Sequence, residues 1–389
     1  MIIRCIMKFI HISDLHIGKR VNEKALIEEQ THILGQICDI VAARKPDAVL
    51  IAGDVYDKAV PSGEAVLLFD DFLTRLSTLV GHVFVISGNH DSAERIAFGS
   101  RIMSAKGIHL SPVYDGETEP MTLSDEYGEV DIYMLPYIRP VHVRHFLSDE
   151  DKTQVDSYDS AVRKAIGMMA PDPQRRNVLV THQFVTGALR SESEDVNVGG
   201  LDNVDASAFD CFDYVALGHL HRPQDCGDER VRYSGSPLKY SFSEVYDNKS
   251  LTVVVLKEKG VLEREFVPLL PLHDWHDLRG TYEELTSRAF YAGKPWTEDF
   301  VRITLTDEQD IPDAIGKLRT IYHNLMELRY DNKRTQSGFS VSDGTVGTEE
   351  KTPMELFSEF YAKQNGDELS DDQKTYLMNV VEKIWEDSK

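Results

Sequence analysis

Five short apolar runs of this chain each end in side chains that can bind metal ions or transfer protons. These side chains are carboxylates, imidazoles and one carboxamide, and no cysteine is among them. In chain order they are Asp14 and His16; Asp54 and Asp57; Asn89, His90 and Asp91; His182; and His219 and His221. A glycine stands directly before three of the five groups, which suits a sharp turn at the end of a strand. The set predicts a metal centre assembled from five separate segments.

The types of these side chains restrict which metal they bind. Mixed oxygen and nitrogen donors without thiolate disfavour a structural zinc site and favour Mn²⁺ or Fe²⁺, whereas Mg²⁺ is less well matched to imidazole. Two Asp, one Asn and four His make seven ligands, which is too many for one ion. A carboxylate that bridges two ions explains the number, and two ions ~3.5–4 Å apart recur in enzymes that displace phosphoryl groups. We predict two divalent ions, with Mn²⁺ favoured and Mg²⁺ or Fe²⁺ as alternatives.

Strands and helices must bring these motifs together, because each motif alone is a weak signal. The apolar runs are rich in β-branched residues and are expected as strands at 8–12, 48–52, 83–86, 178–180 and 214–217. Helical spacing predicts one helix from about Leu26 to Val41, ended before Pro46, and another over 63–80. This alternation predicts an α/β sandwich with buried sheets. Ligand sites in such sheets form beyond the carboxyl ends of strands, so the five motifs are expected at one edge.

The pattern changes in the C-terminal part of the chain. Residues 251–256 and 261–267 predict an antiparallel pair that turns at Lys259–Gly260. The main domain is expected to span 1–270, followed by a small α+β domain over 271–330 with a strand at 300–305 and a helix at 311–329. Residues 331–352 have few large apolar side chains and predict a linker. Residues 353–389 predict two amphipathic helices, the second after Ser370, which need a surface on which to dock.

Composition places further limits on the function. The chain has 389 residues, of which 41% are hydrophobic, and no run approaches the ~18 apolar residues of a membrane span. Polar His11, Ser13 and Asp14 come too early for a signal peptide, so we expect a cytoplasmic protein with reduced cysteines. The net charge of −23 argues against binding nucleic acid through bulk electrostatics. A DNA substrate would need bound metal, a local basic patch or a partner.

The five motifs, in this order, resemble those of the calcineurin-like metallophosphoesterases. The resemblance implies a β-sandwich flanked by helices, with one metal held by Asp14, His16 and His221, the other by Asn89, His182 and His219, and Asp54 bridging them. It implies that His90 is a catalytic histidine that assists the leaving oxygen, with Asp57 as the partner that orients it. Asp91 is expected to be structural.

Longer segments resemble the SbcD family of bacterial SbcC–SbcD nuclease subunits over residues 7–270. They are HDSAER at 90–95, VGGLD at 198–202, FDYVALGHLHRPQ at 212–224 and YSGSPLKYSFSE at 233–244. This resemblance implies a metal-dependent DNA nuclease, a double-strand exonuclease and single-strand or hairpin endonuclease, that acts in DNA end processing, repair and recombination. It implies an SbcC-like ATPase partner with coiled coils, docked by helices in 353–389, and a capping domain over 271–330.

The same resemblance implies a homodimer within a heterotetramer, through the apolar faces of 63–80 and 93–105. No functional counterpart is expected for the acidic stretch 190–195, and the Lys239–Tyr240 region is one option for contact with DNA backbone. Two alternatives stay open: a phosphomonoesterase or cyclic-nucleotide phosphodiesterase with the same metals, and a non-catalytic scaffold. The scaffold requires degraded ligands, and none is missing from the sequence.

Overall fold

A computed structural model of the chain describes residues 6–194, 203–309 and 311–332, together with 357, 358, 361, 369, 370, 373, 374, 376 and 377. The chain divides into two compact units, Met1–Tyr330 and Asp331–Lys389. Within the described residues, each helix is too short or too polar to cross a membrane.

The first sheet contains the strands that precede the first three motifs. β1 (Met7–Ile12), β4 (Ala48–Ala52), β5 (His82–Ile86) and β6 (Ile108–Leu110) are parallel neighbours in this order. β15 (Ser250–Leu256) and β16 (Leu262–Pro268) extend the sheet on the other side of β1 as antiparallel strands. The predicted antiparallel pair is therefore confirmed, and Val261 N–H closes its turn on the carbonyl oxygen of Glu258.

The second sheet carries the last two motifs. Its strands run in the order β13 (Gln224–Cys226), β14 (Asp228–Tyr233), β12 (Tyr214–Gly218), β9 (Arg176–His182), β8 (Gly128–Leu135) and β7 (Met121–Asp125). β12, β9 and β8 are parallel. β8 was not predicted because polar residues interrupt its apolar ones. One of them, Asp131, is buried and accepts a hydrogen bond from Thr122 on β7.

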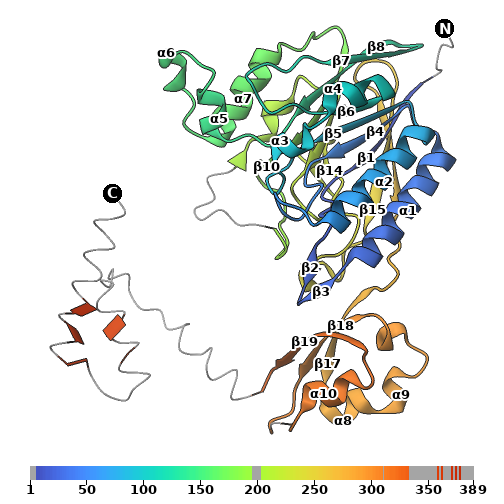
Figure 1. The fold of residues 1–389 in the computed structure, drawn as a ribbon, viewed down its shortest axis with the longest axis vertical. Coiled ribbons are helices and arrows are strands. Elements are labelled where there is room, and N and C mark those ends of the chain that lie inside the picture. The colour runs from blue at the N-terminus through green and yellow to red at the C-terminus, as the bar shows by residue number, and fades with distance from the viewer. Residues whose placement is uncertain are drawn as a thin grey trace. The chain divides into compact units, whose positions relative to one another are not determined.

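The two sheets pack face to face, and helices cover their outer faces (Figure 1). Phe9, Phe84 and Tyr214 belong to the apolar cluster between the sheets. α1 (Ile27–Arg44) and α2 (Gly63–Leu79) pack on the first sheet, and both confirm the predicted helices. α5 (Pro140–Arg144) and α7 (Tyr158–Met169) pack on the second. The shorter helices are α3 (Ala93–Ile96), α4 (Ser100–Met103) and α6 (Asp149–Lys152).

A three-stranded parallel sheet follows the sandwich within the same unit. It consists of β17 (Trp275–Gly280), β18 (Phe300–Leu305) and β19 (Asn324–Tyr330), joined by α8 (Tyr282–Thr286), α9 (Arg288–Tyr291) and α10 (Ala314–Arg319). The predicted strand at 300–305 is confirmed, but the predicted helix over 311–329 is wrong. The helix ends at Arg319, and residues from 324 onward pair with β18. Pairing with residues 324–330 satisfies the backbone N–H and C=O groups at the edge of β18. This gain outweighs the helical spacing of the apolar residues.

The second unit is described at a few positions only. Phe357, Ser358 and Tyr361 are helical, as are Gln373, Lys374, Tyr376 and Leu377. Ser370 N–H donates to Oε1 of Gln373 (2.9 Å) and Gln373 N–H donates to Oγ of Ser370 (3.4 Å), which is a capping box. The helix predicted after Ser370 is present at these positions. Residues 333–352 of the predicted linker, and Leu356, Phe360, Val380, Val381, Ile384 and Trp385, lie outside the described residues.

Candidate metal centre

Segments from both sheets meet at one edge of the sandwich, beyond the carboxyl ends of their strands. The structure brings together there all seven side chains predicted as ligands. Those from the first sheet follow β1, β4 and β5, and those from the second sheet end β9 or follow β12. They are Asp14, His16, Asp54 and Asn89 in the first sheet and His182, His219 and His221 in the second. All but Asn89 are buried.

The backbone at this edge is held in an unusual conformation. Asp14, His16, Asp54 and His219 have positive φ values of 53°, 44°, 47° and 108°. Non-glycine residues rarely adopt this region, and such residues cluster at functional sites. Hydrogen bonds between the two strand ends maintain it, because Asp14 N–H donates to Gly53 O (3.1 Å) and His16 N–H donates to Asp54 O (2.9 Å). The backbone, rather than side-chain packing alone, therefore directs these ligands inward.

Two glycines at this edge are required by close approach. A Cβ on Gly88 would lie 2.1 Å from Oδ1 of Asp54, and a Cβ on Gly218 would lie 1.8 Å from the carbonyl oxygen of Ala52. The glycines that precede the motifs therefore allow the strand ends to approach one another as well as to turn.

The side chains converge on Asp54 and Asn89. Oδ2 of Asp54 lies 3.3 Å from Nε2 of His182 and 3.6 Å from Nε2 of His16. Burial raises the pKa of Asp54, but His182 and the neighbouring histidines outweigh burial and hold it well below its usual range. Oδ1 of Asn89 lies 2.9 Å from Nε2 of His182 and 3.0 Å from Nδ1 of His219.

The arrangement around His182 fits a bound cation. Its Nδ1 must carry the proton, because it lies 2.8 Å from the carbonyl oxygen of Ala52, which can only accept. In the neutral ring, the lone pair of Nε2 then faces two oxygen acceptors, on Asp54 and Asn89. A proton or a metal ion is needed between them. Burial lowers the pKa of His182, but the charges of Asp54 and Asp14 raise it to about 9.

A second group of buried donor atoms, from Asp14, His16 and His221, also lies close together. Nε2 of His16 lies 3.0 Å from Nε2 of His221, and Asp14 is buried beside them. Burial raises the pKa of Asp14 to about 6, against the opposing charges of His182 and His221. The donor atoms of Asp14, His16 and His221 lie within 4.8 Å of one another, and so do those of Asp14, Asp54 and His182. The residues therefore fit two divalent ions that share Asp54.

His90 and Asp57 are also at this edge, in a different relationship from the predicted one. Nε2 of His90 lies 4.0 Å from Oδ2 of Asp54. Nδ1 of His90 is 3.3 Å from the backbone carbonyl oxygen of Asp57. The Asp57 carboxylate instead accepts a hydrogen bond from Nζ of Lys19 at 2.8 Å. The carbonyl requires a proton on Nδ1, so Asp57 orients His90 through its backbone.

Asp91 supports the turn that carries Asn89 and His90. Its carboxylate accepts hydrogen bonds from the N–H groups of Val55, Tyr56 and Gly88, at 3.0, 2.9 and 3.0 Å. These bonds tie the segments after β4 and β5 to each other, which agrees with the structural role expected for Asp91.

Two family models match the chain. The calcineurin-like phosphoesterase model matches residues 7–223, more than half of the chain, and this range includes every ligand-bearing segment. The chain belongs to the calcineurin-like phosphoesterase family. Its predicted fold, a β-sandwich flanked by helices, is confirmed. The SbcD_C model, described as the type 5 capsule protein repressor C-terminal domain, matches residues 271–365, so the resemblance to SbcD subunits is also confirmed.

Two solved structures are similar to this phosphoesterase. One is a dimetal phosphatase from Danio rerio, with 12% identity, a TM-score of 0.38, and coverage of 68% of this chain and 100% of that one. The other is the protein TT1561 of Thermus thermophilus, with 11% identity, a TM-score of 0.38, and coverage of 67% of this chain and 99% of that one.

The acidic stretch 190–195, for which no role was expected, reaches the metal centre of this phosphoesterase. Oγ of Ser193 accepts from Nδ1 of His221 at 2.6 Å and donates to Oε1 of Glu244 at 2.6 Å. Oε1 of Glu194 accepts a hydrogen bond from the backbone N–H of His221 at 2.7 Å. Sequence reasoning missed these residues, because loop contacts leave no periodic pattern. Residues 195 and 198–202 lie outside the described residues.

Glu244 ends the long segment YSGSPLKYSFSE and forms a buried ion pair with Lys249, 2.6 Å apart. Burial raises the pKa of Glu244, but Lys249 and His221 hold it well below its usual range. Metal-binding histidines commonly donate their other N–H to such a partner, which fixes the tautomer. The Ser193–Glu244 pair therefore directs the lone pair of His221 Nε2 toward His16.

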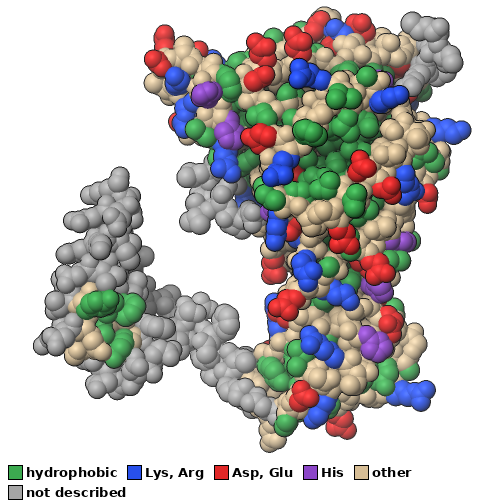
Figure 2. All heavy atoms as spheres, viewed as in Figure 1, with side chains coloured by type: hydrophobic (Ala, Val, Ile, Leu, Met, Phe, Trp, Pro, Cys, Tyr) green, Lys and Arg blue, Asp and Glu red, His purple; other side chains and the backbone are tan. Residues whose placement is uncertain are grey.

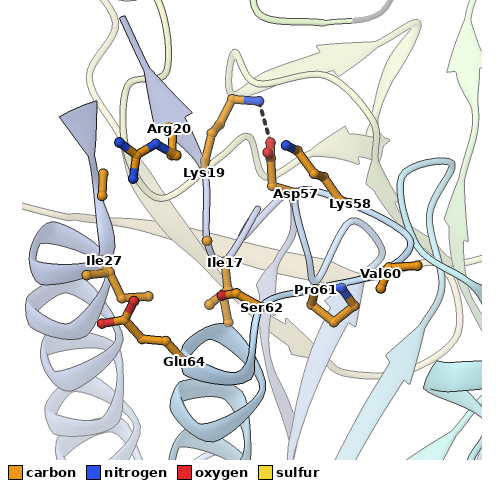
Figure 3. A pocket seen from close by; sticks show the side chains of 12 residues that line it. Ile17, Lys19, Arg20, Ile27, Asp57, Lys58, Val60, Pro61, Ser62 and Glu64 are labelled. Atoms are coloured by element: carbon orange, nitrogen blue, oxygen red, sulfur yellow. Dashed lines mark hydrogen bonds and ion pairs between the residues drawn. The ribbon is translucent and has the colours of Figure 1, made fainter. Parts of the chain in front are cut away.

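A cavity of about 380 Å³ lies beside Asp57, on the His16 side of the centre. Figure 3 shows Lys19 and Lys58 on either side of the Asp57 carboxylate, with Arg20 nearby. In contrast, the side chains of Lys239 and Tyr240 are engaged in contacts within the protein. Nζ of Lys239 is 2.8 Å from Asp274, and buried Tyr240 donates to the carbonyl oxygen of Leu15.

Proposed function

We propose that this chain is a two-metal phosphodiesterase that cleaves DNA, and that it works as the nuclease subunit of a complex with an SbcC-like ATPase. One observation carries the proposal: seven oxygen and nitrogen donors from five segments converge at one edge, in a chain that also matches the SbcD C-terminal domain. Two cations held this way suit displacement at phosphorus, and the match to the SbcD C-terminal domain favours phosphodiesters over phosphomonoesters.

The metal ligands divide into two sets. Asp14, His16 and His221 would hold one ion, and Asn89, His182 and His219 the other, with Asp54 shared. When bound, two divalent ions neutralise charge on phosphoryl oxygens and activate water. The ligand chemistry favours Mn²⁺, with Mg²⁺ or Fe²⁺ as alternatives.

His90 is suited to assist the leaving oxygen. Its Nδ1 proton is directed at the Asp57 carbonyl, which leaves Nε2 on the side of Asp54. As an imidazolium, His90 can donate its Nε2 proton to the oxygen that departs from phosphorus. Such a group typically contributes roughly 10²–10⁴-fold to the rate.

The cavity in Figure 3 has one more cation than anion in its lining: Lys19, Arg20 and Lys58 against Asp57 and Glu64. The chain carries a net charge of −23, yet Lys19, Arg20 and Lys58 border one cavity beside the centre. Lys19 is paired with Asp57, so Arg20 and Lys58 are the cations that would meet DNA phosphates next to the scissile one. Neutralising a few phosphates locally does not require a basic protein overall.

An apolar face over α2, α3 and α4 supports a homodimer. Leu67, Phe98 and Ile102 are 71%, 84% and 80% exposed. Figure 2 shows hydrophobic side chains gathered on this side of the molecule. A cavity of about 480 Å³ lies among them, lined in part by Phe69 and Met103. A contiguous exposed patch of this kind marks a protein interface, and a second copy of this chain is the proposed occupant.

The C-terminal unit supplies the proposed docking element for the ATPase. Phe357, Tyr361, Leu369, Tyr376 and Leu377 line an apolar pocket of about 380 Å³ within this unit. Tyr376 is 71% exposed. Amphipathic helices with such faces bind partner helices, including coiled coils. Deleting residues 340–389 is expected to abolish co-purification with an SbcC-like partner and to retain hydrolysis of small phosphodiesters. Retained co-purification would contradict this assignment.

The test is a cleavage assay on end-labelled duplex and hairpin DNA, with the chain alone and with an SbcC-like partner, in Mn²⁺, Mg²⁺ and chelator. We expect cutting that requires a divalent ion and increases with the partner. Rapid hydrolysis of p-nitrophenyl phosphate with no cut in any DNA would instead favour a phosphomonoesterase.

A further inference from the structure

A second cavity, of about 390 Å³, is lined by residues that follow the third motif, Ala93 and Glu94, and by residues of the second sheet's surroundings. Its walls come from three places: the start of α3, the segment after β6, and the end of β8 together with α5. Aromatic rings and imidazoles dominate the lining, which includes Tyr114, Tyr137, His142, His145 and Phe146. We call this the aromatic cavity.

One residue of the aromatic cavity, Tyr137, also contacts segments of the candidate metal centre. Tyr137 N–H donates to the carbonyl oxygen of Ser87 at 2.9 Å, two residues before Asn89. The ring of Tyr137 meets the ring of His182 edge to face, with centroids 6.3 Å apart. Ala93 on α3, which also lines the cavity, follows His90 by three residues. An occupant of this cavity would therefore lie beside segments that carry Asn89, His90 and His182.

The lining offers flat apolar surface together with polar atoms. Phe146 is 43% exposed, and Tyr114 meets its ring edge to face with centroids 6.0 Å apart. The hydroxyl of Tyr114 is buried and has no hydrogen-bond partner within the described residues. Arg139 stands over the ring of Tyr137, with 5.9 Å between the guanidinium carbon and the ring centroid. Arg139 is outside the lining, whereas Glu94, a carboxylate, is part of it. The exposed ring of Phe146 and the imidazoles of His142 and His145 therefore suit a flat, uncharged ring with polar edges rather than an anion.

We propose that the aromatic cavity binds the nucleobase next to the scissile phosphate, stacked against Phe146. This inference rests on the proposed DNA cleavage and deepens it. Stacking works with any base, because every base has a π face, so the cavity would bind without strong sequence preference. A base can enter only when it is unpaired, and the cavity therefore favours single-stranded, frayed or hairpin ends over fully paired duplex.

The experiment compares two single-stranded substrates with the full chain in Mn²⁺. One is an oligothymidylate, and the other has the same sugar–phosphate length but abasic residues. We expect the wild type to cut the oligothymidylate roughly 5- to 100-fold more efficiently, as measured by kcat/KM. Phe146→Ala should remove most of this preference. Phe146→Leu, which keeps apolar volume and removes the ring, should do the same and shows that folding is not the cause.

Tyr127→Ala is the matched control. Tyr127 is 41% exposed, close to the value for Phe146, but it lies in the turn before β8, at the opposite end of that strand from the metals. This variant should keep the wild-type preference. Stacking can also be measured directly with an oligonucleotide that carries the fluorescent base 2-aminopurine next to a phosphorothioate linkage. Its fluorescence should fall when it binds to the wild type, because stacking quenches it, and should fall much less with Phe146→Leu.

The outcomes separate the two proposals. Equal cleavage of both substrates by the wild type, or an unchanged preference in both Phe146 variants, overturns the nucleobase site and leaves the nuclease assignment standing. No cleavage of either substrate in any divalent ion contradicts the proposed function itself.

Discussion

Nδ1 of His182 donates a hydrogen bond to the backbone carbonyl oxygen of Ala52, 2.8 Å away. His182 ends β9 of one sheet and Ala52 ends β4 of the other, so this contact joins the two sheets at the edge that carries the metal centre. Because a carbonyl can only accept, the contact also sets the tautomer of His182. One hydrogen bond therefore aligns the sheets and directs a ligand lone pair toward Asp54.

Asp54→Asn should remove most metal binding and most activity. Asp54 is the only carboxylate assigned to both ions, and an amide carries no charge to offset them. We expect at least about a 100-fold loss of Mn²⁺-dependent hydrolysis, equivalent to about 3 kcal/mol. Calorimetric titration with Mn²⁺ checks the cause. Two sites of normal affinity in this variant would contradict the bridging role.

His90→Asn separates proton transfer from metal binding. We expect Mn²⁺ affinity within a few-fold of wild type, because His90 is not assigned as a ligand, and a fall in kcat of roughly 10²–10⁴-fold. A substrate with a good leaving group, such as bis-p-nitrophenyl phosphate, should lose less activity than DNA. Equal loss of metal binding and turnover would remove His90 from the proton-transfer role.

Ser193→Ala tests the support of His221. The hydroxyl links His221 to Glu244, and its loss should lower Mn²⁺ affinity roughly 10-fold, toward the lower end of the effect of such supporting contacts. Ser241→Ala is the control, because Ser241 also donates to Oε1 of Glu244, at 2.9 Å, whereas the contact with Nδ1 of His221 comes from Ser193. Equal affinities in the two variants would show that Ser193 does not act on the metal.

Removing the metals should destabilise the fold. Buried acceptors face one another around Asp54 and Asn89, so cations that occupy this space bind the folded chain in preference to the unfolded one. Mn²⁺ at about 100 times its dissociation constant adds about 2.7 kcal/mol per site. For a chain of this size we expect a rise in Tm of about 5 °C or more, reversed by EDTA. Asp54→Asn should lose most of this response, and an equal rise in that variant would place the stabilising ions elsewhere.

Acid should destabilise the protein partly through His11. This side chain is fully buried between the sheets, with Nδ1 2.8 Å from the Tyr214 hydroxyl and Nε2 3.1 Å from the carbonyl oxygen of Leu217. Burial, and then Arg232, lower its pKa to about 3. The unfolded chain, with a histidine pKa near 6.5, therefore binds more protons below that pH, and stability falls as pH drops from about 6.5 toward 3.

The expected contribution of His11 is about 1 kcal/mol per pH unit within this window. Urea unfolding at about pH 7.5, 6 and 5 measures it. His11→Gln removes the titrating group and should lose less stability between about pH 6 and 5 than the wild type does. Identical pH dependence in the two proteins would show that His11 does not contribute.

Much of the candidate metal centre could be predicted from sequence, because each of the seven side chains lies within a few residues of a strand end and its motif is local. Contacts between distant loops could not. Ser193 meets Glu244 across 51 residues of chain, and no spacing rule links them. Asp57 illustrates a different limit: the sequence indicates a residue beside His90, but it does not say that the carbonyl, rather than the carboxylate, makes the contact.

In the fold, too, local features could be predicted from sequence and features that depend on distant segments could not. α1 and α2 follow directly from helical spacing and end signals, such as the Ser62 side chain that accepts from Ala65 N–H. β19 does not, because Leu325 and Leu328 suit one face of a helix as well as they suit a strand. Only the open edge of β18 decides between the two, and that edge is a property of the tertiary structure.

The contact of Gly218 with Ala52 has a consequence for variation in this enzyme. Any side chain at position 218 would act as a wedge between the sheets, since even a methyl group overlaps the Ala52 oxygen and Nδ1 of His182. The absence of a Cβ at position 218 therefore allows the two sheets to approach as closely as they do at this edge. Tolerance to mutation at this edge will be governed by backbone clearance, including at positions that carry no candidate metal ligand.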